Sequence, residues 1–249
     1  MFPIRDHNPS LRPAYVTYAI MTINIAVFMA MLPAFGNETT ISDIYASWAL
    51  VPARVSSGEG AYTFFTSMFM HAGFMHLAGN MLFLWIFGDN LEDEMGHAKY
   101  LGFYIFCGVI AGLAQYLVGT SARVPMVGAS GAIAGVMGGY LLLYPKAKID
   151  VLLIFIIFFK VIPVPAWVML GLWFTIQILG GFSGTAQGGV AYLAHLGGFA
   201  AGLIIIYPRW LALGGRQYWD RTFGLPDNPV ARYEFVKTSI PAVKRRRKR

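Results

Sequence analysis

The sequence predicts an all-α, polytopic membrane protein with six transmembrane helices. Hydrophobic residues make up 57% of its 249 residues and charged residues only 12%, whereas soluble domains average about 45–50% and about 25%. Six apolar stretches approach the length of about 20 residues that a helix needs to cross a bilayer. This composition excludes a disordered protein, a disulfide-rich secreted domain and a coiled coil.

The apolar stretches define the expected domain organisation. Residues 1–14 are expected to form a cytoplasmic tail, residues 15–210 a six-helix membrane domain, and residues 211–249 a flexible, basic cytoplasmic tail. The predicted spans are 15–35, 74–88 with an apolar lead-in from 62, 98–118, 125–144, 164–179 and 190–207. Residues 36–73 then form the first outer loop.

One further apolar run, residues 149–162, does not fit a seventh span. It contains Lys160 and is followed by Pro163 and Pro165. Because proline lacks the N–H that a helix interior requires, we expect this run to be an interfacial or re-entrant segment that precedes the fifth span.

Positive charges set the expected orientation. With a cytoplasmic amino terminus, only Arg54 and Arg123 lie outside, whereas the opposite orientation would translocate nearly all the positive charge. Both termini are therefore expected in the cytoplasm. The basic block at 244–249 is expected to bind anionic lipid, and not nucleic acid. The minimal six-helix form suggests a bacterial inner membrane.

A few polar side chains near the outer ends of the spans are candidate functional residues, because burying such groups in a bilayer is costly. They are Ser130 in the fourth span, His195 in the sixth, and His76 with Asn80 one turn later in the second. Each of these residue types alone more often has a structural role. A serine in a membrane helix usually bonds back to its own helix, a histidine near a helix end often lies at the membrane interface, and an asparagine can hydrogen-bond between helices. Their shared depth below one surface favours a common site.

Small residues predict how two of these helices pack. Gly131 with Gly135 on the fourth helix, and Gly198 with Gly202 on the sixth, form GxxxG pairs, which let helix backbones approach closely. Packing the two helices through these pairs would bring the serine hydroxyl and the histidine imidazole together. A serine needs such a base to become a nucleophile.

The same residues indicate how the chemistry would work. The carboxylates on the outer side all lie in the first loop, so we expect a Ser-His dyad without an acidic third member. His76 and Asn80 lie at i and i+4 and can both donate to an oxyanion, together with the backbone N–H of Ser130. His71 and His76 are five residues apart and no HExxH occurs, so neither a metal nor another cofactor is expected.

These motifs resemble the rhomboid family of intramembrane serine proteases. In chain order, the matching elements are His76-Leu-Ala-Gly-Asn80, Gly88-x-x-x-Glu92-x-x-x-Gly96, Gly128-Ala-Ser130-Gly131, and Ala194-His195-Leu-Gly-Gly198 followed by Gly202. They cover roughly residues 62–207. One GxSG element is a weak signal, whereas four elements on the expected helices are specific.

The resemblance implies roles for the matching residues. It implies that Ser130 is the nucleophile, that His195 is the general base, and that His76, Asn80 and the Ser130 amide form the oxyanion hole. It implies that Glu92, between its two glycines, is a structural anchor. It also implies cleavage of single-pass membrane proteins near the outer face without a cofactor.

Two loops and two departures complete the comparison with the family. Residues 180–189 look like a mobile loop that caps the site, and residues 36–73 resemble a lateral hairpin. Many relatives have Trp-Arg where Tyr62 and Thr63 stand here, and some have an aromatic residue at the position of Ala134 that stacks on the base. What anchors the loop and orients His195 is therefore open.

Two alternatives to proteolysis are compatible with the sequence. A non-catalytic rhomboid-like protein would bind membrane clients without cutting them, although both dyad residues are present here. A small-solute transporter would also use glycine-rich helices and buried histidines, but transporters tend to have two similar halves and midplane charges, and we find no such repeat.

Overall fold

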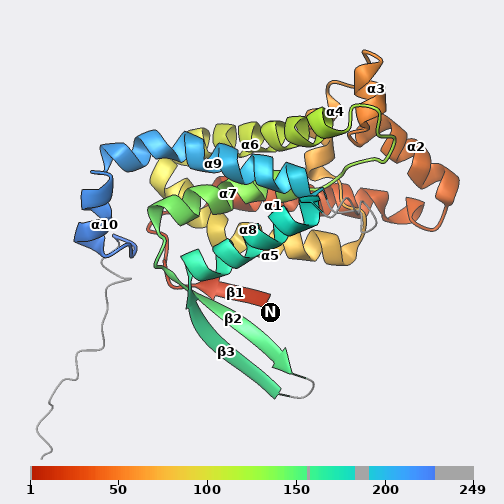
Figure 1. Ribbon diagram of the computed structural model, residues 1–249. Helices are drawn as coiled ribbons and strands as arrows, with labels where there is room; N and C mark the ends of the chain where they lie inside the picture. The colour runs from red at the N-terminus through yellow and green to blue at the C-terminus, as the bar shows by residue number, and fades with distance from the viewer. Residues whose placement is uncertain (1, 156–157, 183–190, 228–249) are drawn as a thin grey trace, which may run out of the picture.

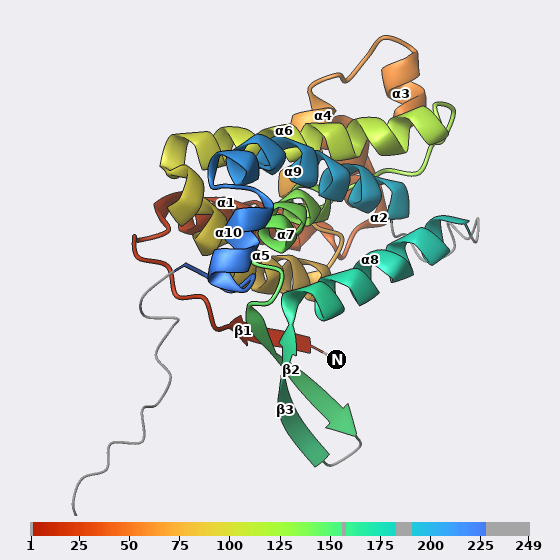
Figure 2. The same ribbon diagram turned by 60° about the vertical axis from the view of Figure 1, so that its left-hand side comes forward.

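The computed structural model describes residues 2–155, 158–182 and 191–227, and it is built around a bundle of six long helices (Figures 1 and 2). Helix α7 packs against α5, α6 and α9, and most of its side chains are buried. The six helices are α1 (Tyr15–Met31), α5 (Phe74–Met95), α6 (His97–Val118), α7 (Ser130–Leu143), α8 (Ala166–Phe182) and α9 (Tyr192–Ala212).

The helices agree with the predicted spans, with differences at their ends. Residues 15–34, which comprise α1 and the short 3₁₀ helix η1 (Leu32–Ala34), are long and apolar enough to cross a membrane, as is α6. Two bent helix pairs also pass that test, one ending in α5 and one beginning with α9. Helix α5 continues past residue 88, where the predicted span ends, to Met95, and α7 begins only at Ser130 and not at residue 125.

Short helices gather at one end of the bundle, which we call the loop end (Figure 1). They are α2 (Glu38–Trp48), α3 (Pro52–Ser56), α4 (Thr63–Thr66) and the 3₁₀ helix η2 (Ser67–Phe69). The Arg54 guanidinium donates to the backbone carbonyls of Ala46 and Ser47 and to the Tyr62 hydroxyl, which itself donates to the Ser47 carbonyl. Hydrogen bonds from Arg54 and Tyr62 therefore anchor this loop.

A three-stranded antiparallel sheet adjoins the opposite end, which we call the strand end (Figure 1). Its strands are β1 (Phe2–Asp6), β2 (Lys148–Phe155) and β3 (Phe158–Pro165), in the order β1-β2-β3. The β2–β3 hairpin projects away from the bundle (Figures 1 and 2). Asp150 in β2 accepts hydrogen bonds from Arg5 at 2.6 Å and His7 at 2.9 Å, which ties β1 to the hairpin.

The strands were not predicted from the sequence. Residues 1–14 were expected to form a tail, and residues 149–162 an interfacial or re-entrant segment. The run is so uniformly apolar that it lacks the alternation by which a half-buried strand is recognised. Its content of β-branched and aromatic residues and its two prolines at the outer, edge strand are nevertheless typical of a sheet.

The region expected to be a flexible tail from residue 211 also differs. Residues up to 227 are ordered against the bundle and include helix α10 (Arg216–Thr222). The Trp219 indole donates to the Leu142 carbonyl at the end of α7 at 3.0 Å, and Tyr218 is buried. The basic block at 244–249 lies outside the described residues.

Glu92 joins α5 to the start of α1 at the strand end. Its carboxylate is buried and accepts hydrogen bonds from the backbone N–H groups of Val16 and Thr17, each at 2.8 Å, and from the Thr17 hydroxyl at 2.7 Å. The first N–H groups of a helix lack partners within the helix and favour negative charge. Glu92 therefore caps α1, and His97 at 2.6 Å completes its coordination.

The two glycines that flank Glu92 are required for different structural reasons. A Cβ at Gly88 would lie 2.8 Å from the Tyr100 hydroxyl and 2.9 Å from a Thr17 methyl group, so only glycine permits this approach of α1, α5 and α6. Gly96 has a φ of +77° at the turn from α5 to α6, a conformation that favours glycine.

Helices α7 and α9 meet through their two GxxxG pairs, as the sequence predicts. A Cβ at Gly198 would overlap the carbonyl oxygen of Gly131, and one at Gly202 would overlap that of Gly135. The backbones are therefore in direct contact, which leaves no room for any side chain along this seam.

Candidate active site

The seam between α7 and α9 brings Ser130 and His195 together at the loop end. Ser130 is the first residue of α7, and His195 lies in the first turn of α9. The Ser130 Oγ and the His195 Nε2 are 2.7 Å apart, a hydrogen-bond distance, although the residues are 65 positions apart in the chain. This is the juxtaposition that the glycine pairs predict.

A cavity of about 490 Å³ opens over this pair. Its wall is formed by α6, α7, α9 and the segment that precedes Ser130, and it is mostly apolar apart from a few polar groups. The polar side chains that line it are Ser67, His76, Ser130 and His195. An enclosed site with few convergent polar groups is typical of a place where a substrate binds.

His76 faces the same cavity from the start of α5. Its Nδ1 accepts a long hydrogen bond, 3.4 Å, from the Ala72 backbone N–H, so the proton of a neutral ring resides on Nε2. Gly128 makes room for this ring: its φ is +130°, and a Cβ there would lie 2.8 Å from His76 Cε1 and Nε2. The Gly128 N–H donates to the Ser67 carbonyl at 2.9 Å, which fixes the approach to Ser130.

Asn80 does not share that position. Its side-chain amide donates to the His76 carbonyl, one turn back on α5, at 2.8 Å, and Asn80 is not among the residues that line the cavity. His71 is fully buried behind His76, with the two rings edge to face at 5.1 Å. Of the three polar residues at this end of α5, only His76 therefore reaches the cavity.

Two residues on α8 that contact His195 were not predicted from the sequence. Gln177 is 6% exposed, and its Oε1 lies 2.7 Å from His195 Nδ1. The Trp173 ring lies one turn earlier, with its centroid 5.7 Å from that of His195. A search for ionisable side chains passes over a neutral amide, but a glutamine within so apolar a span was the available signal.

Comparison with known proteins identifies the family. Residues 58–211 match the family model of the rhomboid domain, which covers more than half of the chain and includes the whole site described above. The chain belongs to the rhomboid family. It is therefore an integral membrane protein, and its six-helix bundle is rhomboid-like, as the motifs predicted.

Curated relatives of this rhomboid come from organelles and bacteria. It is 30% identical over 199 residues to Rhomboid protein 1, mitochondrial, of Saccharomyces cerevisiae, which covers 77% of this chain and 52% of the relative. It is 34% identical over 208 residues to Rhomboid-like protein 11, chloroplastic, of Arabidopsis thaliana, covering 82% and 68%. It is 30% identical over 125 residues to Rhomboid protease GluP of Bacillus subtilis, covering 50% and 24%.

The partial coverage of these relatives limits which of their properties can be assigned to this rhomboid. The chain spans about half the length of the yeast relative and about two thirds of the plant relative. Both of those relatives are organellar by name, so the expectation of a bacterial inner membrane has no support from them.

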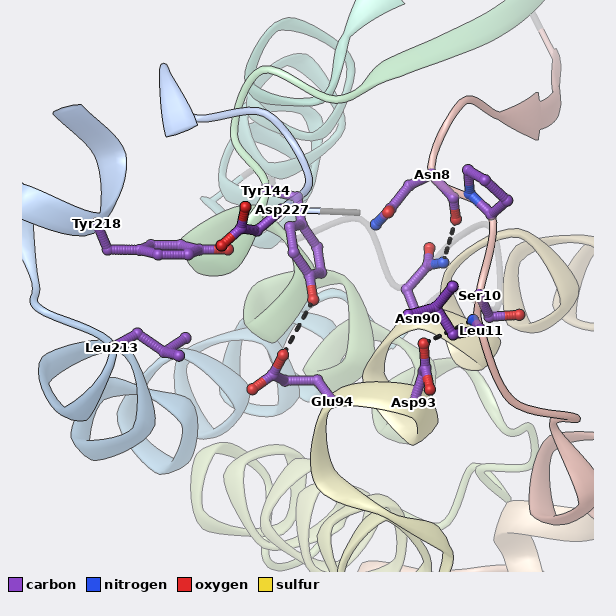
Figure 3. Close-up of a pocket in the computed structure, with 11 residues that line it drawn as sticks. Asn8, Ser10, Leu11, Asn90, Asp93, Glu94, Tyr144, Leu213, Tyr218 and Asp227 are labelled. Atoms are coloured by element: carbon purple, nitrogen blue, oxygen red, sulfur yellow. Dashed lines mark hydrogen bonds between the residues drawn. The ribbon is translucent and has the colours of Figure 1, made fainter. Parts of the chain in front are cut away.

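A second hollow in this rhomboid, at the strand end, has a different character (Figure 3). It measures about 250 Å³ and is lined by acidic, amide and tyrosine side chains. Its carboxylates are already partnered: Asp93 accepts from the Leu11 N–H at 2.8 Å, and Glu94 accepts from the Tyr144 hydroxyl at 3.4 Å. No histidine is among the described residues that line this hollow, so it holds no serine–histidine pair like the one at the loop end.

Proposed function

We propose that this rhomboid is an intramembrane serine endopeptidase that hydrolyses a peptide bond in transmembrane protein substrates. The observation that carries the proposal is the 2.7 Å distance between the Ser130 hydroxyl and the His195 imidazole beneath a cavity of about 490 Å³. A serine and a base in hydrogen-bond contact form the minimal unit of nucleophilic acyl transfer.

In the acylation step, the Ser130 Oγ attacks the scissile carbonyl carbon while His195 Nε2 takes the hydroxyl proton. The resulting imidazolium gives that proton to the leaving amine as the C–N bond breaks, which leaves an ester on Ser130. Water then attacks the ester with His195 as base, releasing the new carboxyl terminus and restoring the hydroxyl. No metal or cofactor takes part in these steps.

Two hydrogen-bond donors flank the position where the oxyanion would develop. The Ser130 backbone N–H lies in the first turn of α7, where an N–H lacks a partner within its own helix. The His76 Nε2–H borders the same cavity. Asn80 keeps a second amide N–H beside the one given to the His76 carbonyl, but it does not line the cavity, so we assign the larger share to the first two.

The proposal includes an orientation in the membrane. The loop end faces the outer side, so that cleavage occurs near the outer leaflet, and both termini lie in the cytoplasm. Single-pass proteins are the expected substrates. The basic block at 244–249 would then bind anionic lipid; equal affinity of a tail peptide for neutral and anionic vesicles would contradict this part.

A fluorophosphonate probe tests the proposal directly, because it forms a stable bond only with an activated serine. The full chain in liposomes is expected to be labelled at Ser130 and to cleave a tagged transmembrane substrate. Ser130→Ala should lose both activities, whereas Ser57→Ala, which removes an exposed hydroxyl at the same end of the bundle, should retain them. A non-catalytic client-binding protein would bind the transmembrane substrate, but it would be neither labelled by the probe nor able to cleave the substrate.

A further inference from the structure

Helix α8 presents a neutral amide to the far side of the proposed general base. Gln177 is buried, at 6% exposure, and its Oε1 lies 2.7 Å from His195 Nδ1, while His195 Nε2 faces Ser130 at the same distance. The three side chains therefore form a continuous chain of hydrogen bonds across α7, α9 and α8. Among the described residues, no carboxylate makes a hydrogen bond to His195.

A backbone carbonyl of α8 determines which ring nitrogen of neutral His195 carries the proton. The Gln177 Nε2 donates to the Trp173 carbonyl, one turn earlier, at 3.3 Å. A carbonyl only accepts, so the amide nitrogen must face Trp173 and the amide oxygen must face His195. Since that oxygen also only accepts, the proton of neutral His195 resides on Nδ1. Its Nε2 is then unprotonated and can accept the Ser130 proton.

From this geometry, and resting on the proposed function, we propose that Gln177 is a positioning residue that holds His195 in the tautomer required of a general base. It takes the place that an aspartate has in a Ser-His-Asp triad. A carboxylate at this position would be a buried charge without a cation beside it, which is costly. An amide selects the tautomer without that cost, and Trp173 limits rotation of the ring from the same helix.

Two substitutions separate positioning from packing. Gln177→Met keeps the length and volume of the side chain but removes the acceptor, and Gln177→Glu keeps the acceptor but adds a charge. Thr175→Val serves as the control on the same helix, because its hydroxyl is exposed and bonds only to the Gly171 carbonyl. Cleavage of a transmembrane peptide in liposomes, measured from about pH 5 to about pH 9, would give kcat and KM for each.

We expect Gln177→Met to lower kcat by about 10- to 100-fold, with KM changed by less than about twofold. Gln177→Glu should recover most of the rate and should move the acidic limb of the pH profile to higher pH, because a carboxylate favours the imidazolium. Thr175→Val should match the parent chain. An unchanged kcat and pH profile for Gln177→Met would overturn the proposal, as would equal losses in both Gln177 variants without a shift of the limb.

A measurement that needs no activity distinguishes failure of this inference from failure of the proposed function. Nitrogen-15 NMR of histidine-labelled protein in nanodiscs, with His195 assigned by His195→Ala, reports which ring nitrogen carries the proton. The parent chain should be protonated on Nδ1 and Gln177→Met should shift toward Nε2, whether or not the chain cleaves a substrate. A parent chain protonated on Nε2 would refute the role of Gln177 even in an active protease.

Discussion

The carboxylates at the strand end and the candidate catalytic groups at the loop end differ in how many hydrogen bonds and ion pairs they make. At the strand end, Glu92 is surrounded by the donors of two other helices, and Asp93 and Glu94 are paired with Arg12 and Arg209. At the loop end, Ser130 and His76 border a cavity, and each side chain makes a single hydrogen bond within the described part of the chain.

This contrast indicates a division of labour along the helices. Buried polar groups whose hydrogen bonds are all made stabilise the fold. Groups that react with a substrate must keep donors or acceptors free for it, so they contribute less to folding stability. Substitutions at the two ends should therefore separate stability from activity.

Ser130→Ala should abolish proteolysis and leave the fold intact. Loss of the nucleophile is expected to lower kcat by at least about 10³-fold. The midpoint of thermal unfolding in detergent should change by no more than about 2 °C, because only one hydroxyl is lost beside a cavity. Residual cleavage above about a tenth of the parent rate would contradict the division of labour at the loop end.

Glu92→Ala should have the reverse effect at the strand end. It removes the acceptor of four hydrogen bonds and uncaps α1, so the free energy of unfolding should fall by about 3 kcal/mol. The folded fraction should retain kcat within about twofold. Glu59→Gln, at an exposed carboxylate, should change stability by less than about 0.5 kcal/mol. Unfolding titrations together with cleavage rates measure both quantities.

Gly202→Ala should lower both stability and activity, because the α7–α9 seam connects the two ends of the bundle. The new methyl group would overlap the Gly135 carbonyl oxygen and force the helices apart, at a cost of about 1–3 kcal/mol. It should lower kcat as well, since the same seam sets the distance between Ser130 and His195. Gly171→Ala is the matched control, because a Cβ there meets nothing within 4 Å. Equal behaviour of the two variants would show that the seam tolerates widening.

Asp6 should give the strand end a modest pH dependence. Burial raises the pKa of its carboxyl to about 7, partly offset by the hydrogen bond that the Tyr140 hydroxyl donates at 2.7 Å. The ordinary value is 3.8, so the folded state binds the proton more tightly than the unfolded state between about pH 4 and about pH 7. Its stabilisation is complete below that window and is lost as the pH rises through it.

The difference between the two pKa values corresponds to at most about 4 kcal/mol. Because Asp6 is partly exposed to solvent, the expected effect on the free energy of unfolding is about half of that, about 2 kcal/mol. Asp6→Asn should flatten the stability of the full chain across that window while leaving the activity profile unchanged at the loop end. Thermal unfolding at a series of pH values measures the slope, and a slope that persists in Asp6→Asn would assign it to another group.

The helices and the juxtaposition of Ser130 with His195 could be predicted from the sequence because their signals are local or geometrically simple. Long apolar stretches indicate spans, and Ser130 and His195 each lie next to a GxxxG pair that dictates the helix contact. Glu92 was likewise assigned a structural role, and its contacts with α1 give the physical reason.

The features that were missed depend on pairing between distant segments. Strand β1 is defined by its pairing with β2, about 145 residues away, and no property of residues 2–6 alone indicates it. Gln177 stands out in the sequence only as a polar residue within an apolar span, and its contact with His195 exists only when α8 lies against α9. The expected capping loop at 180–189 lies largely outside the described residues.

The contact between α7 and α9 also limits how this site can vary. Glycine is the smallest residue, and here the backbones of the two helices already touch at Gly131–Gly198 and Gly135–Gly202. The interaxial separation is therefore at its lower bound, and a Cβ at Gly198 or Gly202 can only increase it. Inherited variation at Gly198 and Gly202 therefore has one direction available, toward a greater distance between the Ser130 hydroxyl and the His195 imidazole.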